Sequence, residues 1–398
     1  HTHYSLVVRG ACTVDDFETG SRSAVCGGVT TFIDYADPIE GKSLAYAMEQ
    51  RRREAEGKTC IDYHLHMCLY GNRAWTMAEL QELKEAGVWN FKVFTTYDAM
   101  QIPDDNLEKL LVDANKLGML VTVHAEDQDT VRTVGEQLQA AGKVAPSCHG
   151  RSRPNEAESR AIANVIALAE KHNTPVYFVH VSTGEGARLI REAQNRGVRV
   201  YGETCPHYLV LSEECFQREL PQQYIMTPPL RSRQDNLELW RALEDGVLQV
   251  VATDHCAYTL DQKRKGETCF TTLPGIPGSE TLLPVLFSEG VNKGKLTLAQ
   301  LAAYLATNPA KLFGLYPRKG VLREGSDGDL VLVDPNLEKT LEGKLLHSEA
   351  GYTPFHGITV KGYPVLTVTR GRIAYQNGDF RGQPGWGQFV AATEINWI

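Results

Sequence analysis

The chain has 398 residues, a formal net charge of -8 at pH 7, 42% hydrophobic residues and 23% charged residues. This is the composition of an ordinary globular protein, and the length accommodates one large α/β barrel or two to three smaller domains. The sequence has no basic stripe that would bind nucleic acid and no run of 18 apolar residues that would span a membrane. Its nine cysteines lie singly, without a CxxC pair, which favours reduced thiols and a cytoplasmic location.

The chain begins with two histidines separated by one residue, His1 and His3. Because side chains alternate along a strand, both imidazoles would lie on one face and reach one metal ion. A strand that starts at the first residue has no support before it, so we expect the native chain to extend upstream; a tag remnant is the alternative. The apolar run 6–8 is interpreted either as a loop that lines a pocket or as core, and 13–16 is typical of a helix start.

Strands and helices then alternate. Apolar and β-branched runs predict strands over 29–36, 60–67, 88–97, 119–124, 176–181, 198–203 and 248–254. Periodicity and capping residues predict helices over 42–56, 77–86, 104–117, 127–141, 155–172, 184–196, 234–245, 279–290 and 297–313. Such alternation indicates parallel βαβ units. We therefore expect an α/β fold, a TIM-like (β/α)8 barrel over 1–315, rather than an open doubly wound sheet, because no Gly-rich GxGxxG turn follows the first strand.

The sequence pattern changes after about residue 316: alternating strands and helices give way to short predicted strands separated by Gly-containing turns. We expect strands over 329–333, 358–360, 365–368 and 372–375. The segment 316–398 is thus predicted to form a small β-sandwich side domain followed by a C-terminal tail. The Gly-rich tail from residue 382 is a candidate for wrapping a neighbouring subunit.

One lysine, Lys92, stands in the middle of the strand predicted over 88–97. Alone it would be interpreted as a lysine that reaches the surface, because burying an ammonium is costly unless it is paired or neutralised. Other predicted strands, however, end in residues of the kind that bind metals, namely His124, His180 and Asp254. A buried neutral lysine can react with carbon dioxide to give a carbamate, whose two oxygens can bridge two metal ions. This is the role we predict for Lys92.

Four histidines, this lysine and Asp254 match the needs of a two-metal hydrolase, because imidazole and carboxylate suit zinc and similar metals. Two such ions can share a hydroxide and polarise a carbonyl. Asp254 can bind one metal and also accept the proton of the attacking water, then pass it to the leaving nitrogen. Tyr97 lies just past the Lys92 strand, where its phenol either donates to an oxyanion or caps the barrel rim as a packing residue.

The motifs HTH, FKVFTTY, VHAE, VHVS, ETCPHYL, PPLR and ATDH occur in this order. As a set they resemble the hydantoinase/dihydropyrimidinase family of cyclic amidohydrolases, and the resemblance covers nearly the whole chain. It implies a barrel with a β-sandwich side domain and a homotetramer, with a dimer as the alternative. It also implies two divalent metal ions, Zn2+ first and Mn2+ or Co2+ as alternatives, and a carbamate on Lys92 (N6-carboxylysine).

The resemblance also implies roles for single residues. His1, His3, Lys92 and Asp254 match the ligands of the first metal, and Lys92, His124 and His180 match those of the second. Tyr97 matches a tyrosine that donates to the oxyanion. Thr227 falls where relatives often have a serine that contacts the ring, and Gly275 falls where many have an asparagine that contacts it through the backbone.

A second pair, His64 and His66, lies outside this matched set and is predicted to pack or to position other groups. His207 and His255 are likewise predicted to lie near the site without binding metal.

The substrate expected from the resemblance is a hydantoin or a 5,6-dihydropyrimidine, which a metal-bridging hydroxide would open to an N-carbamoyl amino acid. Relatives that open dihydroorotate have an arginine two residues after the HxH pair, and this chain has Ser5 there. The bulky apolar run 6–8 favours a ring with a hydrophobic or small 5-substituent. Allantoinase or dihydroorotase-type ring opening is the alternative within the class. A non-catalytic scaffold and a mononuclear deaminase are the alternatives outside it.

Overall fold

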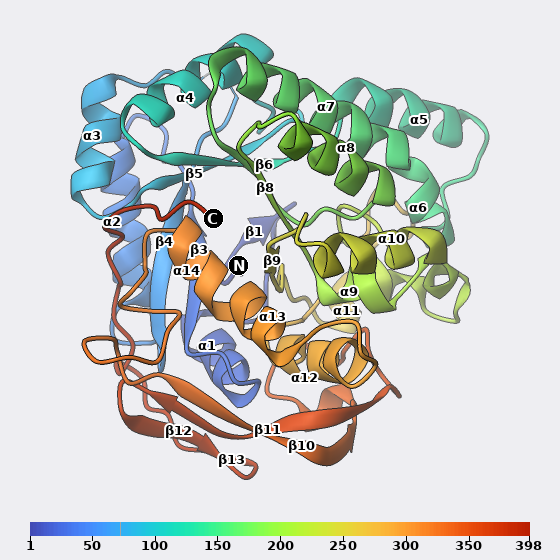
Figure 1. Ribbon diagram of the computed structural model, residues 1–398. Coiled ribbons are helices and arrows are strands. Elements are labelled where there is room, and N and C mark those ends of the chain that lie inside the picture. The colour runs from blue at the N-terminus through green and yellow to red at the C-terminus, as the bar shows by residue number, and fades with distance from the viewer. Residues whose placement is uncertain (72) are drawn as a thin grey trace.

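Seven parallel strands form the main sheet of the computed structural model, which describes residues 1–71 and 73–398. They lie side by side in chain order: β3 (Thr31–Ala36), β4 (Asp62–Cys68), β5 (Asn90–Phe94), β6 (Leu120–His124), β7 (Val176–Phe178), β8 (Val200–Thr204) and β9 (Val250–Val251). Every residue of β4, β5 and β6 is buried, as expected for parallel strands covered on both faces. The sheet curls as its neighbouring strands twist (Figure 1).

The first three residues close the gap between the two edges of this sheet. The Thr2 backbone N–H donates to Ile33 O of β3 (2.9 Å), and the His3 N–H donates to His255 O, just after β9 (2.8 Å). Thr2 also pairs with His255 in a parallel bridge. Residues 1–3 therefore stand where the eighth strand of the barrel is expected, and the predicted TIM-like barrel class is confirmed.

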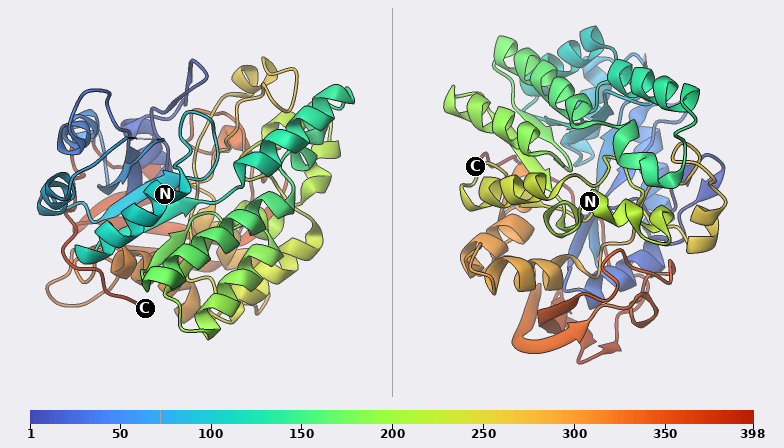
Figure 2. Two further views of the ribbon diagram at one scale, coloured as in Figure 1. Left: turned by 90° about the horizontal axis from the view of Figure 1, so that it is seen from above. Right: turned by 90° about the vertical axis from the view of Figure 1, so that its right-hand side faces the viewer.

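Helices cover the outside of the curled sheet (Figures 1 and 2). The long ones are α2 (Leu44–Ala55), α3 (Met77–Glu85), α4 (Asp104–Lys116), α5 (Gln128–Ala140), α7 (Asn155–His172), α8 (Gly184–Asn195) and α10 (Arg233–Glu244). Their bounds lie within two residues of those predicted from the sequence. The reason is visible in α3 and α10, which begin at capping boxes formed by Thr76 with Glu79 and Ser232 with Asp235.

The helix predicted over 279–290 ends in a π-helical turn, and the helix predicted over 297–313 is interrupted by one. The first is α12 (Leu282–Leu286) continued by η4 (Phe287–Val291), and the second is α13 (Leu298–Ala302), η5 (Ala303–Thr307) and α14 (Asn308–Leu312). The remaining short helices are α1 (Phe17–Cys26), η1 (Pro146–Cys148), α6 (His149–Ser152), α9 (Pro206–Val210), η2 (Glu213–Gln217), η3 (Pro221–Tyr224), α11 (Leu260–Arg264) and η6 (Gly343–Leu345). Among the described residues, no helix combines the length and the apolar character needed to cross a membrane.

A second, antiparallel sheet lies at one end of the molecule, next to α1 and α12 (Figures 1 and 2). It consists of β10 (Leu330–Thr340), β11 (Thr359–Thr369), β12 (Arg372–Gln376) and β13 (Asp379–Phe380) in chain order. The prediction of separate strands over 358–360 and 365–368 is wrong, because both belong to β11. Gly362 joins them with φ +97° beside an irregularity in the β10–β11 register, and its backbone lies directly against the Phe287 ring. Residue 316, our proposed domain boundary, falls between α14 and β10.

A buried lysine ties the small sheet to the barrel. Lys319 Nζ donates to Asp62 Oδ2 at the start of β4 (2.7 Å) and to Asp329 Oδ2 just before β10 (2.6 Å). The chain beyond β13 then returns along the barrel: the Val390 N–H donates to Tyr63 O, and Trp397 stacks on Tyr201. The C-terminal tail thus packs on its own chain, where Figure 1 shows it as a red trace ending beside the barrel.

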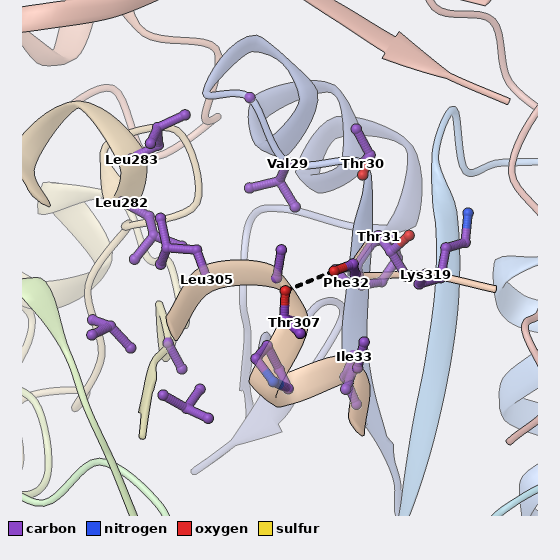
Figure 3. A pocket seen from close by; sticks show the side chains of 18 of the residues that line it. Val29, Thr30, Thr31, Phe32, Ile33, Leu282, Leu283, Leu305, Thr307 and Lys319 are labelled. Carbon is purple, nitrogen blue, oxygen red and sulfur yellow. Dashed lines mark hydrogen bonds between the residues drawn. The ribbon is translucent and has the colours of Figure 1, made fainter. Parts of the chain in front are cut away.

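A cavity of about 840 Å³ lies between β3, α12 to α14 and β10. Its walls are largely apolar, with Val29, Leu282 and Leu305 among the side chains that line it (Figure 3). At its other end it reaches His1 and Glu203. The cavity therefore extends from the predicted metal-binding residues through the barrel toward the small sheet.

Two short strands, β1 (Val7–Val8) and β2 (Ala11–Cys12), form a hairpin after the first three residues. Leu6 and Val8 pack against a buried cluster that contains Tyr258 and Leu273, whereas Val7 is 65% exposed. The apolar run 6–8 thus serves in part as packing and in part as exposed surface.

Candidate metal centre and active site

The residues predicted to bind metal lie at the carboxyl ends of the barrel strands. Lys92 is in β5, His124 is the last residue of β6, His180 lies two residues past β7, and Asp254 follows β9. Parallel strands of a barrel bring these ends together on one face, where barrel enzymes place their active sites.

The first group consists of His1, His3 and Asp254. The Nε2 atoms of His1 and His3 lie 3.1 and 3.2 Å from Asp254 Oδ1. One ligand atom from each of the three residues lies within 4.8 Å of the other two, close enough to share an ion. Although burial opposes the charged form, the hydrogen bonds from both histidines hold the pKa of Asp254 well below its usual range. Two imidazoles and an ionised carboxylate fit a divalent ion of the zinc type.

Lys92 is buried beside this group, with only 2% of its surface exposed. Its Nζ lies 5.0 Å from the centre of the Phe94 ring and 5.5 Å from that of Tyr35. Burial lowers the pKa of Lys92 to about 8, although the carboxylates of Asp254 and Glu203 oppose this shift. The neutral amine is therefore a minor form of this lysine at pH 7, but a far larger one than for a lysine with the ordinary pKa of 10.5.

His124 and His180 form the second group, with ring centres 4.5 Å apart. His124 Nε2 lies 2.7 Å from Glu126 Oε2, which makes Nδ1 the candidate ligand atom of this ring. Burial lowers the pKa of both histidines. Both are therefore neutral imidazoles, the form that binds metal ions.

Three of the predicted site residues have strained backbones. Tyr97, His180 and Asp254 have φ angles of +72°, +40° and +47°, in the left-handed region that non-glycine residues rarely adopt. Such strain costs about 1 to 3 kcal/mol per residue and persists only where the surrounding structure imposes it, typically at functional sites.

Tyr97 and Thr227, predicted to contact the substrate, lie together. The Tyr97 hydroxyl is 2.6 Å from Thr227 Oγ1. The Tyr97 ring lies 5.2 Å from the His124 ring, and the Arg153 guanidinium sits over it at 5.2 Å. Burial raises the pKa of Tyr97 to about 12, so its phenol keeps its proton and can donate a hydrogen bond.

Gly275 lies on the segment next to Thr227. Its N–H donates to Ile225 O (2.9 Å), and its carbonyl accepts from Lys263 Nζ (2.6 Å). Its φ is +145°, and a Cβ atom here would lie 2.3 Å from Cys256 O. A side chain at this position would be strained and would collide with Cys256, so glycine suits it.

Two buried glutamates that hold the candidate ligands were not predicted from the sequence. Glu203, in β8, places Oε1 2.8 Å from His1 Nδ1 and also accepts from the His180 N–H (3.3 Å). Glu126 accepts two hydrogen bonds from Arg153 (2.7 and 2.8 Å) besides its contact with His124. The only signal for Glu126 is its spacing, because a residue two positions after His124 returns to the same side of an extended chain.

Residues 1–3 are held in place by Asp34 of β3. Asp34 Oδ2 accepts from the Thr2 hydroxyl (2.8 Å) and the Tyr4 N–H (2.9 Å), and Oδ1 accepts from Arg51 (2.6 Å). Because Thr2 stands between His1 and His3, this contact, together with the backbone hydrogen bonds of Thr2 and His3, helps to hold both histidines in place.

Of the other histidines near the site, His64 and His255 bond to protein groups, whereas both ring nitrogens of His66 and Nε2 of His207 are buried without a hydrogen-bond partner in the described part of the chain. His64 Nδ1 lies 2.8 Å from Val390 O, and His255 Nε2 lies 2.9 Å from Asp15 Oδ2. His255 Nδ1 accepts from the N–H groups of Gly278 and Ser279. The contacts of His64 and His255 fit the packing and positioning roles predicted for these two residues, and the roles of His66 and His207 stay predictions.

Comparisons with known proteins cover almost the whole chain. Residues 1–374 match the model of the amidohydrolase family. The chain is 39% identical to the D-hydantoinase of Ralstonia pickettii over 395 residues, which are 98% of this chain and 86% of that one. It is 38% identical to the D-phenylhydantoinase of Escherichia coli O1:K1 over 396 residues, 98% of this chain and 85% of that one. The crystal structure of the dihydropyrimidinase from Brevibacillus agri superposes with a TM-score of 0.96 at 37% identity, covering 99% of this chain and 87% of that one.

Proposed function

The chain belongs to the hydantoinase/dihydropyrimidinase family of cyclic amidohydrolases, and on this basis we propose that it hydrolyses the ring amide of a hydantoin or a 5,6-dihydropyrimidine. The product would be the N-carbamoyl amino acid. The observation that carries the proposal is the convergence of His1, His3 and Asp254 beside buried Lys92 at the carboxyl ends of the strands.

Membership of this family implies catalysis that depends on a divalent metal. We propose two ions, Zn2+ first: His1, His3, Lys92 and Asp254 would hold one, and Lys92, His124 and His180 the other. When bound, two such ions supply Lewis acidity that lowers the pKa of water and polarises the ring carbonyl.

Lys92 would reach both ions as a carbamate. In this modification the Nζ lone pair forms a bond to the carbon of carbon dioxide, and one amine proton is released. The product carries one negative charge over two oxygens. Deep burial of Lys92 and its lowered pKa support the proposal, because only the neutral amine has the lone pair that reacts.

Asp254 would carry the proton during hydrolysis. Water adds to the ring carbonyl carbon, and its proton passes to Asp254 and then to the ring nitrogen as the C–N bond breaks. The same carboxylate therefore serves as base and then as acid. Its strongly lowered pKa keeps it ionised before the reaction begins.

Tyr97 and Thr227 would bind the ring. The Tyr97 phenol, neutral at the pH of the reaction, would donate to the carbonyl oxygen as negative charge develops there. The Thr227 hydroxyl, already 2.6 Å from the phenol, would contact the cyclic amide together with the backbone at Gly275.

The class of ring is proposed from the hairpin that follows the HxH pair. Ser5 supplies no positive charge to bind a carboxylate on the ring, and Leu6 and Val8 are packed apolar residues. A 5-substituent that is hydrophobic or small suits this surface better than the carboxylate of dihydroorotate. The D-phenylhydantoinase of E. coli is named for a substrate of the first kind. We also propose a homotetramer, with a dimer as the alternative, which light scattering would distinguish.

The test combines metal analysis with a panel of substrates: hydantoin, 5-phenylhydantoin, dihydrouracil, allantoin and dihydroorotate. We expect about two metal ions per chain and opening of the first three rings. Asp254→Asn serves as the inactive control, and Asp261→Asn, at the exposed surface, as the active one. One metal and no ring opening would favour a mononuclear deaminase, and no metal at all a scaffold. If the enzyme opened only allantoin or only dihydroorotate, that compound would replace the hydantoin or dihydropyrimidine as the proposed substrate.

A further inference from the structure

A second buried lysine, Lys263, lies outside the proposed metal centre. It belongs to the short helix α11, and its side chain is fully buried. The charged neighbours on the same helix, Asp261 and Arg264, pair with each other at the surface (3.3 Å). Lys263 thus points inward from a helix whose other charges face solvent.

The Lys263 ammonium donates to three backbone carbonyls. Nζ lies 2.8 Å from Ile225 O, 3.1 Å from Leu273 O and 2.6 Å from Gly275 O. An ammonium has three N–H donors, so these carbonyls satisfy all of them.

No negative charge balances this ammonium in the described part of the chain, where none of the ion pairs includes Lys263. The titratable groups that face it from other elements are Cys256 after β9 and His149 in α6, and η3, which packs against α11, carries Tyr224. Burial raises the pKa of Cys256 to about 12, lowers that of His149 to about 4 and raises that of Tyr224, so all three are neutral at pH 7. Burial also lowers the pKa of Lys263 to about 7.

The three carbonyls belong to the two segments that would bind the substrate ring. Ile225 stands two residues before Thr227, and Leu273 two residues before Gly275. The segments are also joined directly, because the Gly275 N–H donates to Ile225 O (2.9 Å). Lys263 therefore joins the two segments, in addition to their direct backbone hydrogen bond.

We propose that Lys263 is a positioning residue for substrate binding: its ammonium holds the segments of Thr227 and Gly275 at the separation that the cyclic amide requires. This inference rests on the proposed function. A buried ammonium without a counter-ion is costly, and an apolar side chain would fill the same volume without that cost. The three hydrogen bonds explain why an amine stands here, because the backbone groups that they fix need a donor.

The test compares wild-type enzyme with Lys263→Met, which keeps the length of the side chain but has no donor. Lys265→Met, two residues along at the exposed surface, is the matched control. We expect KM for the ring substrate to rise about tenfold or more in Lys263→Met, because a small misplacement of contacting groups is enough to weaken binding strongly. We expect kcat to change less than KM and the metal content to stay as in the wild type. Lys265→Met should match the wild type throughout.

The pH dependence of KM distinguishes the positioning role from a purely structural one, because a purely structural role would not change it. Above about pH 7 the amine loses one of its three donors. The advantage of wild type over Lys263→Met in KM should therefore be largest below pH 7 and shrink as the pH rises. If Lys263→Met does not fold, Lys263→Gln, which keeps amide N–H donors on a shorter side chain, replaces it with the same expected direction.

The outcomes separate the two proposals. A raised KM with retained metal supports the positioning role. An active wild type together with an unchanged KM in the variant overturns the role of Lys263 alone. A fall in kcat and metal content with KM unchanged also overturns it, because Lys263 would then act on the metal centre or the fold. A wild type that opens none of the rings overturns the proposed function and this inference together.

Discussion

Removing the hydroxyl of Tyr97 tests the chemistry assigned to the site. In Tyr97→Phe the ring stays in place against His124 and under Arg153, 5.2 Å from each. The variant loses only the phenol and its 2.6 Å hydrogen bond to Thr227. The fold should therefore lose about 1 kcal/mol of unfolding free energy, the usual contribution of one hydrogen bond.

The effect on catalysis should be much larger than this. A donor aimed at a developing oxyanion contributes about 10²- to 10³-fold to kcat, or roughly 2.7 to 4 kcal/mol. We therefore expect kcat for 5-phenylhydantoin to fall by about 10²-fold or more, with a smaller change in KM.

Steady-state ring opening, followed by ultraviolet absorbance, measures both constants, and urea denaturation measures the fold. Tyr304→Phe is the matched control, because Tyr304 is also buried and donates its phenol to a partner, Leu243 O (2.6 Å), away from the proposed site residues. A kcat for Tyr97→Phe within threefold of the control would refute the oxyanion role. Tyr97 would then be a packing residue at the barrel rim.

Three further predictions follow from buried charges. Glu203→Gln removes the carboxylate that contacts and positions His1. Metal affinity, measured against a competing chelator, should therefore fall by roughly 10- to 100-fold. An unchanged affinity would contradict the positioning of His1 by Glu203. Lys319→Met removes the nearer cation of buried Asp62 and leaves only Arg370, 3.7 Å away, so the unfolding free energy in urea should fall by about 3 kcal/mol. A loss below about 1 kcal/mol would show that the Lys319 ion pairs contribute little to stability. Lys263 has a pKa of about 7 in the fold against 10.5 in the unfolded chain, so between these values the unfolded chain binds more protons and stability should rise with pH. Relative to Lys263→Met this rise should reach on the order of a few kcal/mol, and equal slopes for the two proteins would contradict the shift.

Much of the barrel was predictable because local patterns and the fold agree. The helix predicted over 155–172 is α7 with the same bounds. Pro154 precedes it, and Asn173 ends it in the left-handed region with φ +49°. The candidate ligands were predictable for a related reason: polar residues that follow buried strands stand out against their apolar neighbours, and parallel strands bring their ends together.

The residues that hold the ligands were not predictable, because their contacts depend on closure of the barrel. Glu203 reaches His1 across 202 positions of sequence, and nothing near either residue signals the pair. Lys263 stands in the polar run DQKRKGE, which is typical of an exposed helix, yet it is the one lysine of that run that is buried. In the small sheet, Gly362 divided one strand into two predicted ones, because a glycine interrupts the strand pattern but here permits close contact with Phe287.

Metal content per chain distinguishes two proposed ions that share Lys92 as a ligand from a single ion held without it. Wild type and Lys92→Ala should be loaded with zinc in the presence of bicarbonate, freed of excess metal and assayed for ring opening. We predict about two ions per chain in the wild type and at most one in Lys92→Ala, with ring opening lost and partly restored by a short carboxylate. A Lys92→Ala enzyme that keeps two ions and wild-type turnover would contradict the proposed role of Lys92.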